Sequence, residues 1–271
     1  PLLRAMTALQ PGKVKDTEVL TLTSGAGIRL FKPDNLADAS PALLWIHGGG
    51  YVIGQAKMDD ALCSRFAKHL GIIVASVEYR LAPEHPYPAA VEDCYSALKW
   101  LAALPSVDRS HVAIGGASAG GGLTAALALY ARDRGEIAPA FQLLTYPMLD
   151  DRTLPNSAVE RNYRLWNARS NRFGWSSYLR GADPTVAVPA RREDLSGLPP
   201  AWVGVGTLDL FYDEDIAYAA RLKDAGVPCE VEIVQGAFHG FDALAAKSGV
   251  GRAFFDRQCD ALRGALTPSA A

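Results

Sequence analysis

Short apolar runs recur along the chain, and stretches with helical spacing separate them. A short, continuously apolar run is typical of a strand that is covered on both faces of a sheet. Strands are expected over residues 42–46, 72–77, 112–117, 141–147, 201–207 and 230–234, and helices over 60–70, 89–104, 119–129, 213–225 and 250–262. This alternation predicts an α/β fold with a mostly parallel sheet and helices on both faces.

The beginning and the end of this pattern carry their own signals. Residues 17–23 alternate like a half-exposed strand, and residues 28–31 return after a Ser-Gly-Ala-Gly turn, which predicts an antiparallel hairpin. The last amphipathic helix is expected to end before Gly264.

Residues 148–188 interrupt the alternation. This stretch carries arginine, asparagine, serine and aromatic residues without a strand pattern, and residues 161–179 have loose helical spacing. Because it leaves the carboxyl edge of the sheet, we expect an inserted lid, with a surface excursion as the alternative. The chain has no internal repeat or low-complexity linker, so residues 1–271 are expected to form one domain.

Charge and composition narrow the choice of partners. The 271 residues carry a formal net charge of -2, and no run of like charges indicates nucleic acid or a membrane surface as a partner. No apolar run reaches membrane-spanning length, and residues 1–10 lack the layout of a secretory signal. These features predict a cytoplasmic protein that acts on small, neutral molecules.

The cysteines lie far apart, with no CxxC pair and no ligand spacing with histidine. Buried free thiols are therefore the favoured interpretation, with disulfides or a metal site as the alternatives. The residues are Cys63, Cys94, Cys229 and Cys259.

Residues Gly116–Gly120 spell G-x-S-x-G between an expected strand and an expected helix. The chain must reverse sharply there, and the apex lies in a strained backbone region, so small residues are needed two positions away on either side. This turn exposes Ser118 as a nucleophile and directs the amide of Ala119 at the charge that develops during attack. A glycine-rich turn with an incidental serine is the alternative.

A serine hydroxyl needs a base, and His239 follows a strand at the same edge of the sheet. Phe238 and Gly240 would give its ring an apolar wall and room to turn. Asp209, which also follows a strand, would orient the imidazole and stabilise its protonated form. Asp213 is the competing acid, but its position at a helix start favours N-capping.

The run His47–Gly50 ends another buried strand. Successive glycines carry an entropic cost, which indicates that the backbone approaches something closely. The amides of Gly49 and Gly50, with that of Ala119, could donate hydrogen bonds to the oxyanion of a tetrahedral intermediate. A flexible turn is the alternative interpretation.

The remaining histidines favour structural roles. His69 and His111 lie at a helix end and before a strand, where solvated or capping roles predominate, and His85 is expected to fix a proline-rich loop by hydrogen bonding. No metal-binding triad emerges from their spacing.

Three segments stand out together: they are His47–Tyr51, the run from Tyr79 to Ala90 (YRLAPEHPYPAA) and Gly116–Gly121. In combination they resemble the hormone-sensitive-lipase-like family of α/β-hydrolases. The likeness continues in order through Asp209 and the Phe238–Phe241 turn. It implies an eight-stranded sheet, carboxylesterase activity on short to medium acyl chains, no cofactor, and frequent dimers.

The chain departs from this family in three places. Ala117 stands where the family usually has aspartate, and Leu210 stands where a proline commonly follows the catalytic acid. Neither change removes a catalytic atom, so activity should survive. Only residues 1–16 precede the first expected strand, where the family usually carries a longer helical cap, so they are interpreted as a short remnant of that cap.

The sequence therefore predicts a serine carboxylesterase that hydrolyses small-molecule esters through an acyl-enzyme, with Ser118, Asp209 and His239 as the triad. The same residues would serve an amidase or deacetylase, which is the first alternative. A ligand-binding receptor on a degenerate hydrolase scaffold is the second, although such receptors typically lose a triad residue.

Overall fold

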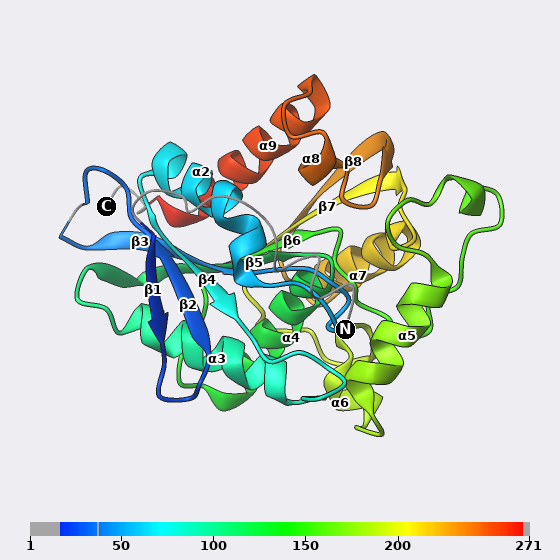
Figure 1. The fold of residues 1–271 in the computed structure, drawn as a ribbon, viewed down its shortest axis with the longest axis horizontal. Helices are drawn as coiled ribbons and strands as arrows, with labels where there is room; N and C mark the ends of the chain where they lie inside the picture. The colour runs from blue at the N-terminus through cyan, green and yellow to red at the C-terminus, as the bar shows by residue number, and fades with distance from the viewer. Residues whose placement is uncertain (1–16, 37, 268–271) are drawn as a thin grey trace.

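A computed structural model describes residues 17–36 and 38–267 of the chain. The predicted cap remnant, residues 1–16, lies outside the described residues. The strands form one eight-stranded sheet in the order β1-β2-β4-β3-β5-β6-β7-β8 (Figure 1). The strand bounds are Glu18–Thr21, Gly27–Phe31, Ser40–Ile46, Ile73–Glu78, Val107–Ala117, Phe141–Thr145, Ala201–Leu208 and Cys229–Phe238, for β1 to β8 in order.

The pairing confirms the expected architecture. β1 and β2 form the antiparallel hairpin, and β2 also pairs with β4 in the antiparallel sense. From β4 to β8 every neighbouring pair is parallel, so the carboxyl ends of these strands meet at one edge. The turns that follow β3, β5, β7 and β8 are therefore brought to the same side of the molecule.

Helices cover both faces of the sheet (Figure 1). Leu44 and Ile46 of β3 point into one hydrophobic cluster with α3, α4 and α7, whereas Leu43 and Trp45 point into the other with α2 and α9. This alternation along one strand is the consequence of its period of two. The helices are α2 (Asp60–Leu70), α3 (Ala89–Ala102), α4 (Ala119–Arg134), α7 (Tyr212–Asp224) and α9 (Gly249–Leu266).

Two element ends differ from the sequence prediction. β5 begins at Val107, ahead of the apolar run, because Val107 pairs with Ser40 of β3 and so brings polar residues such as Asp108 and Ser110 into the strand. α9 continues through Gly264 to Leu266, since Leu262 and Leu266 both lie buried in the cluster. The expected stop at Gly264 was therefore wrong.

Residues 148–188 contain no strand and three short helical pieces. These are η2 (Glu160–Asn162), α5 (Ala168–Leu179) and α6 (Pro184–Ala187), and η3 (Pro189–Arg191) follows them. Of residues 161–179, where helical spacing was expected, only Ala168–Leu179 form a regular α-helix. Two further short helices, η1 (Ala56–Asp59) and α8 (Phe241–Leu244), follow the glycine-rich turn after β3 and the turn after β8.

Within the described part of the chain, no helix is both long and apolar enough to cross a lipid bilayer. All four cysteines are free thiols. Cys63, Cys94 and Cys259 are buried, as expected, whereas Cys229 is partly exposed.

Candidate active site

Three side chains from separate turns meet at the carboxyl edge of the sheet. His239 Nε2 lies 2.9 Å from Ser118 Oγ, and His239 Nδ1 lies 2.8 Å from Asp209 Oδ2. Ser118 and His239 are each 7% exposed and Asp209 is 3% exposed. The imidazole therefore lies between a hydroxyl and a carboxylate in a site with little bulk water, where both hydrogen bonds are strengthened.

The turn that carries Ser118 is strained. Ser118 has φ 59° and ψ -123°, a backbone region that residues with side chains rarely adopt. A β-carbon at Gly116 would lie 2.5 Å from the Gly120 carbonyl oxygen, and one at Gly120 would lie 2.0 Å from the Ile46 carbonyl oxygen. The two motif glycines thus allow strand, turn and helix to pack closely, and Ala119 becomes the first residue of α4.

Asp209 and His239 are fixed by their neighbours. The second carboxylate oxygen of Asp209 accepts a hydrogen bond from the Phe211 amide at 3.0 Å. The rings of Tyr146 and Phe211 meet the His239 ring edge-on, with centroids 4.8 and 5.1 Å away. These rings supply the apolar wall that the sequence interpretation assigned to Phe238.

Phe238 itself packs against the hydrophobic cluster under α2 and α9. Asp213 is also placed differently from the prediction. The N-cap of α7 is Phe211, and Asp213 lies in the first helical turn without capping it. An acid in the first turn is favoured by the helix dipole, which explains its position there.

The glycine-rich turn after β3 lies against Ser118. A β-carbon at Gly48 would lie 3.2 Å from Ser118 Cβ, and both Gly49 (φ 121°) and Gly50 (φ 59°) have left-handed backbones. Ala119 is the first residue of a helix, whose first amides have no acceptor within that helix. The three amides predicted for the oxyanion hole thus belong to the glycine-rich turn and to the first residue of α4, and Gly48 and Ser118 bring these two places into contact.

The side chain of His47 stabilises this glycine-rich turn. Its ring stacks on Tyr79 with centroids 4.2 Å apart, and the Tyr79 hydroxyl donates to the His47 carbonyl at 2.9 Å. Burial lowers the pKa of His47 to about 4, so the ring stays neutral. A neutral ring can donate from Nδ1 to the Gly48 carbonyl, 2.8 Å away, which fixes the first glycine.

The 148–188 segment lies directly over the glycine turn. A β-carbon at Gly50 would meet Trp166 Cη2 at 2.0 Å, and one at Gly174 of α5 would meet the Gly50 carbonyl oxygen at 2.8 Å. Sequence reasoning did not single out Trp166, since nothing local to it indicates a contact with a turn more than a hundred residues earlier.

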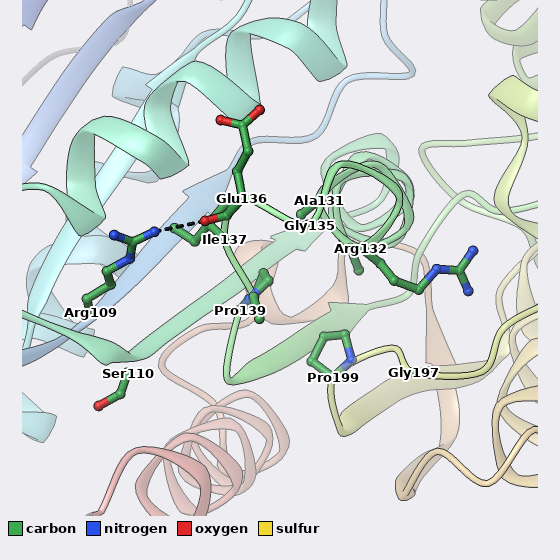
Figure 2. Close-up of a pocket in the computed structure, with 12 residues that line it drawn as sticks. Arg109, Ser110, Ala131, Arg132, Gly135, Glu136, Ile137, Pro139, Gly197 and Pro199 are labelled. Atoms are coloured by element: carbon green, nitrogen blue, oxygen red, sulfur yellow. Dashed lines mark hydrogen bonds between the residues drawn. The ribbon is translucent and has the colours of Figure 1, made fainter.

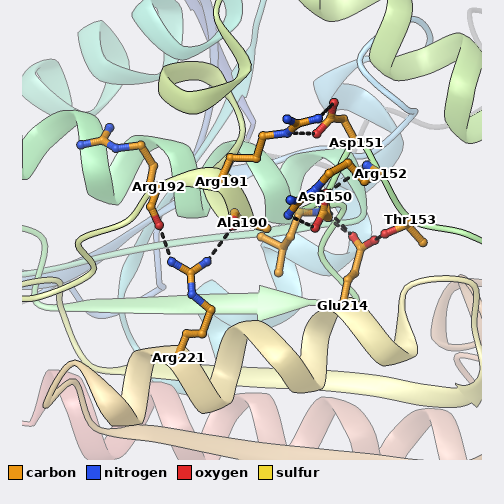
Figure 3. A network of polar contacts seen from close by, with 10 residues as sticks. Asp150, Asp151, Arg152, Thr153, Ala190, Arg191, Arg192, Glu214 and Arg221 are labelled. Carbon is orange, nitrogen blue, oxygen red and sulfur yellow. Dashed lines mark hydrogen bonds and ion pairs between the residues drawn. The ribbon is translucent and has the colours of Figure 1, made fainter.

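One helix, α7, fastens both ends of this segment (Figure 3). At the first end, the Glu214 carboxylate accepts hydrogen bonds from the Leu149 and Asp150 amides at 2.6 and 3.3 Å and from the Thr153 hydroxyl. Burial raises the pKa of Glu214 to about 8, although these hydrogen bonds oppose the shift.

At the second end, Arg221 of α7 donates to the Ala190 carbonyl at 2.7 Å and to the Arg192 carbonyl. The two ends of the segment are also joined directly, because Arg191 forms a bidentate ion pair with Asp151 at 2.6 and 2.7 Å. The start and the end of the segment are therefore tied both to α7 and to each other.

The remaining histidines lie away from this centre. His69 packs edge-on against Phe255, with centroids 5.8 Å apart, and His111 lies 2.8 Å from Asp108 and 3.0 Å from Ser110. The hydrogen-bonding role predicted for the His85 side chain stays a prediction. No cluster of three His, Cys, Asp or Glu side chains among the described residues could hold a metal ion.

A cavity of about 570 Å³ lies at the opposite edge of the sheet from Ser118 (Figure 2). Ser110 near the start of β5, Pro139 before β6 and Pro199 before β7 line it, together with Gly135 at the end of α4. The Arg109 guanidinium at its rim donates to the Glu136 carbonyl at 2.8 Å. This cavity is separated from the catalytic edge by the length of the strands.

Comparisons with known proteins agree with this geometry. Residues 43–243 match the family described as α/β hydrolase fold. The chain is 38% identical to esterase LipI of Mycobacterium tuberculosis over 225 residues, covering 79% of this chain and 70% of that protein. It is 32% identical to the ethyl acetate hydrolase of Pseudomonas putida, covering 87% of this chain and 79% of that protein.

Solved structures give the same result. A bacterial heroin esterase superposes with a TM-score of 0.85 at 38% identity, covering 98% of this chain and 89% of that chain. The metagenomic carboxylesterase EstE1 superposes with a TM-score of 0.87 at 31% identity, covering 98% of this chain and 95% of that chain. The protein therefore belongs to the α/β-hydrolase fold family, within its hormone-sensitive-lipase-like group.

Proposed function

We propose that the protein is a serine carboxylesterase. The observation that carries the proposal is the 2.9 Å approach of His239 Nε2 to Ser118 Oγ, with the strained serine turn packed against Gly48 of the glycine-rich loop. The esterase and ester hydrolase names of the similar proteins support the same reaction class. An intact triad argues against a degenerate, ligand-binding scaffold.

In the first half-reaction, Ser118 Oγ attacks the ester carbonyl carbon while His239 Nε2 takes the hydroxyl proton. The carbonyl π pair moves to oxygen, and the amides of Gly49, Gly50 and Ala119 donate to the oxyanion. When the carbon–oxygen bond to the alcohol breaks, the protonated imidazole gives its proton to the departing alcohol. Asp209 stabilises the imidazolium in between.

In the second half-reaction, water attacks the acyl-enzyme through the same groups. His239 removes a proton from the water, the oxyanion forms again, and Ser118 leaves with the proton from the imidazolium. The products are a carboxylic acid and regenerated enzyme. No residue outside the three turns takes part in either proton transfer, and the scheme uses no cofactor or metal.

Small, neutral esters with short to medium acyl chains are the substrates we propose. The near-neutral chain supports this choice, as does the low exposure of Ser118 and His239, which suits a small carbonyl compound. Residues 148–188 are proposed as the lid of this site because Trp166 and Gly174 contact the Gly50 loop. Homodimer formation and a cytoplasmic location stay predictions from the sequence.

The test compares Ser118→Ala with Ser110→Ala, which removes an exposed hydroxyl at the far end of β5. With p-nitrophenyl butyrate, Ser118→Ala should lower kcat/KM by more than about a thousandfold, because no nucleophile replaces the lost oxygen. A fluorophosphonate probe should label the wild type and Ser110→Ala and leave Ser118→Ala unlabelled. Substantial turnover by Ser118→Ala would refute the proposal.

A parallel assay separates ester from amide hydrolysis. The wild type is given an ester and its isosteric amide, which share the acyl group and differ only in the leaving atom. Higher kcat/KM for the ester supports the carboxylesterase, whereas a preference for the amide assigns the protein to the amidase and deacetylase class.

A further inference from the structure

Two consecutive residues, Leu165 and Trp166, approach two different turns beside the catalytic centre. The Trp166 ring fills the space over Gly50 in the oxyanion loop. A β-carbon at Gly240, which directly follows His239, would lie 3.0 Å from Leu165 Cδ1. A single dipeptide of the 148–188 segment thus reaches from the loop that faces the oxyanion to the turn that carries the base.

The two side chains are held differently. Trp166 is anchored, because its indole nitrogen donates to Asn171 Oδ1 at 3.2 Å and Asn171 is 1% exposed. Leu165 has a φ of 63°, which is unfavourable for a leucine, and its side chain is 65% exposed. The anchored tryptophan therefore keeps the leucine at a position that its own burial does not explain.

The chemistry of the reaction assigns a side of the substrate to each loop. In the tetrahedral intermediate, the oxyanion must point at the Gly49 and Gly50 amides, and the alcohol oxygen must face His239 Nε2 to receive its proton. The acyl chain extends in the remaining direction, away from both of these groups. The carbon atoms of the alcohol therefore leave the site past the His239–Gly240 turn, where Leu165 lies.

We propose that Leu165 is a specificity-determining residue that forms the outer wall of the alcohol side of the site and limits the bulk of the leaving group. The inference rests on the esterase function proposed above. Because Leu165 lies against the turn of the base, changes at Leu165 are expected to leave the preference for acyl-chain length unaltered.

The experiment measures kcat/KM for two ester series. One keeps the butyryl group and changes the alcohol from ethanol to cyclohexanol, and the other keeps ethanol and changes the acyl group from acetyl to hexanoyl. The variants are Leu165→Ala and Leu165→Phe. The matched control is Leu154→Ala, which removes a leucine of the same segment that is 81% exposed.

Leu165→Ala should raise the cyclohexyl-to-ethyl ratio of kcat/KM about tenfold, since removing a few carbons from an apolar wall changes discrimination by at least that factor. Leu165→Phe should lower the same ratio. The hexanoyl-to-acetyl ratio should stay within about twofold of wild type in both variants, and Leu154→Ala should change neither ratio.

The inference would be overturned if both Leu165 variants still hydrolyse ethyl butyrate but keep the wild-type cyclohexyl-to-ethyl ratio. A change confined to the hexanoyl-to-acetyl ratio would overturn it as well. Failure of the wild type to hydrolyse any ester would overturn the proposed function, and this inference with it. Circular dichroism melting curves that match wild type within a few degrees establish that the variants are folded.

Discussion

Gly120 has no side chain, and this absence allows α4 to start directly against β3. The β-carbon of an alanine there would lie 2.0 Å from the Ile46 carbonyl oxygen and 2.6 Å from that of His47. Both atoms belong to backbone, which cannot rotate away as a side chain can. The position of Ser118 above these atoms therefore depends on the absence of a side chain two residues later.

Gly120→Ala is expected to destabilise the protein by about 3 kcal/mol, because helix and strand must separate to relieve the overlap. The matched control is Gly264→Ala in α9, where a β-carbon meets nothing within 4 Å. That change should stabilise by about 0.5–1 kcal/mol, as alanine favours helix over glycine. Urea unfolding measures both, and a similar sign for the two changes would contradict the steric account.

The meeting of Ser118, Asp209 and His239 could be predicted because each lies in a turn whose local sequence carries a signal. Ser118 is framed by glycines, and Asp209 and His239 each follow an expected strand. Tyr146, Leu165 and Trp166 carry no such signal. Their contacts with His239, Gly240 and Gly50 depend on how distant segments pack, which no spacing rule in a single sequence reveals.

At the scale of elements, α7 has two tasks. It begins three residues after Asp209, and it binds both ends of the 148–188 segment through the buried Glu214 and the partly buried Arg221. The helix itself could be predicted from its apolar spacing. Its partners could not, because a glutamate and an arginine on a helix normally indicate a solvated face.

The contribution of Glu214 to the free energy of unfolding depends on pH. In the unfolded chain a glutamate has a pKa near 4.5, whereas burial raises the pKa in the folded protein to about 8. The folded state therefore favours the protonated form. The stability that this preference contributes is complete below pH 4.5 and is lost progressively as the pH rises to 8.

Glu214→Gln cannot ionise and keeps an oxygen for the Leu149 amide. Between pH 5 and pH 9 its free energy of unfolding should fall less than that of the wild type, so the variant gains relative stability as the pH rises. Glu160→Gln, an exposed change within the 148–188 segment that Glu214 anchors, is the control. Parallel stability curves for wild type and Glu214→Gln, measured by urea unfolding, would be evidence against a buried, protonated Glu214.

At the scale of the whole molecule, the sheet separates two hydrophobic clusters. Buried cysteines lie in both, Cys94 on the α3 face and Cys63 and Cys259 on the α2 and α9 face. The mostly parallel sheet and its two helical layers could be predicted from the alternation of apolar runs. The polar extension of β5 and the path of residues 148–167 could not, since long-range contacts specify both.

The distribution of thiols gives a test of the whole fold. In the native protein only Cys229, which is partly exposed, should react with Ellman's reagent. The reaction should be slow at pH 8, because burial raises the pKa of this thiol to about 11. In guanidinium chloride all four cysteines of the sequence should react at once. Cys229→Ser should remove the native signal, and rapid reaction of a second thiol would mean that one of the clusters is open.

The fastening of residues 148–188 at both ends to α7 has a consequence for how this scaffold can change. Glu214 and Arg221 bind the two ends of the segment. Leu165 lies between these ends in the sequence and contacts the Gly240 turn beside His239. Residues 154–165 of this segment are exposed or only partly buried, so they can accept new sequences without shifting Ser118, Asp209 or His239. Laboratory libraries confined to residues 154–165, which leave Trp166 and α5 unchanged, should therefore yield folded enzymes with new preferences, and natural divergence of selectivity is expected to concentrate there.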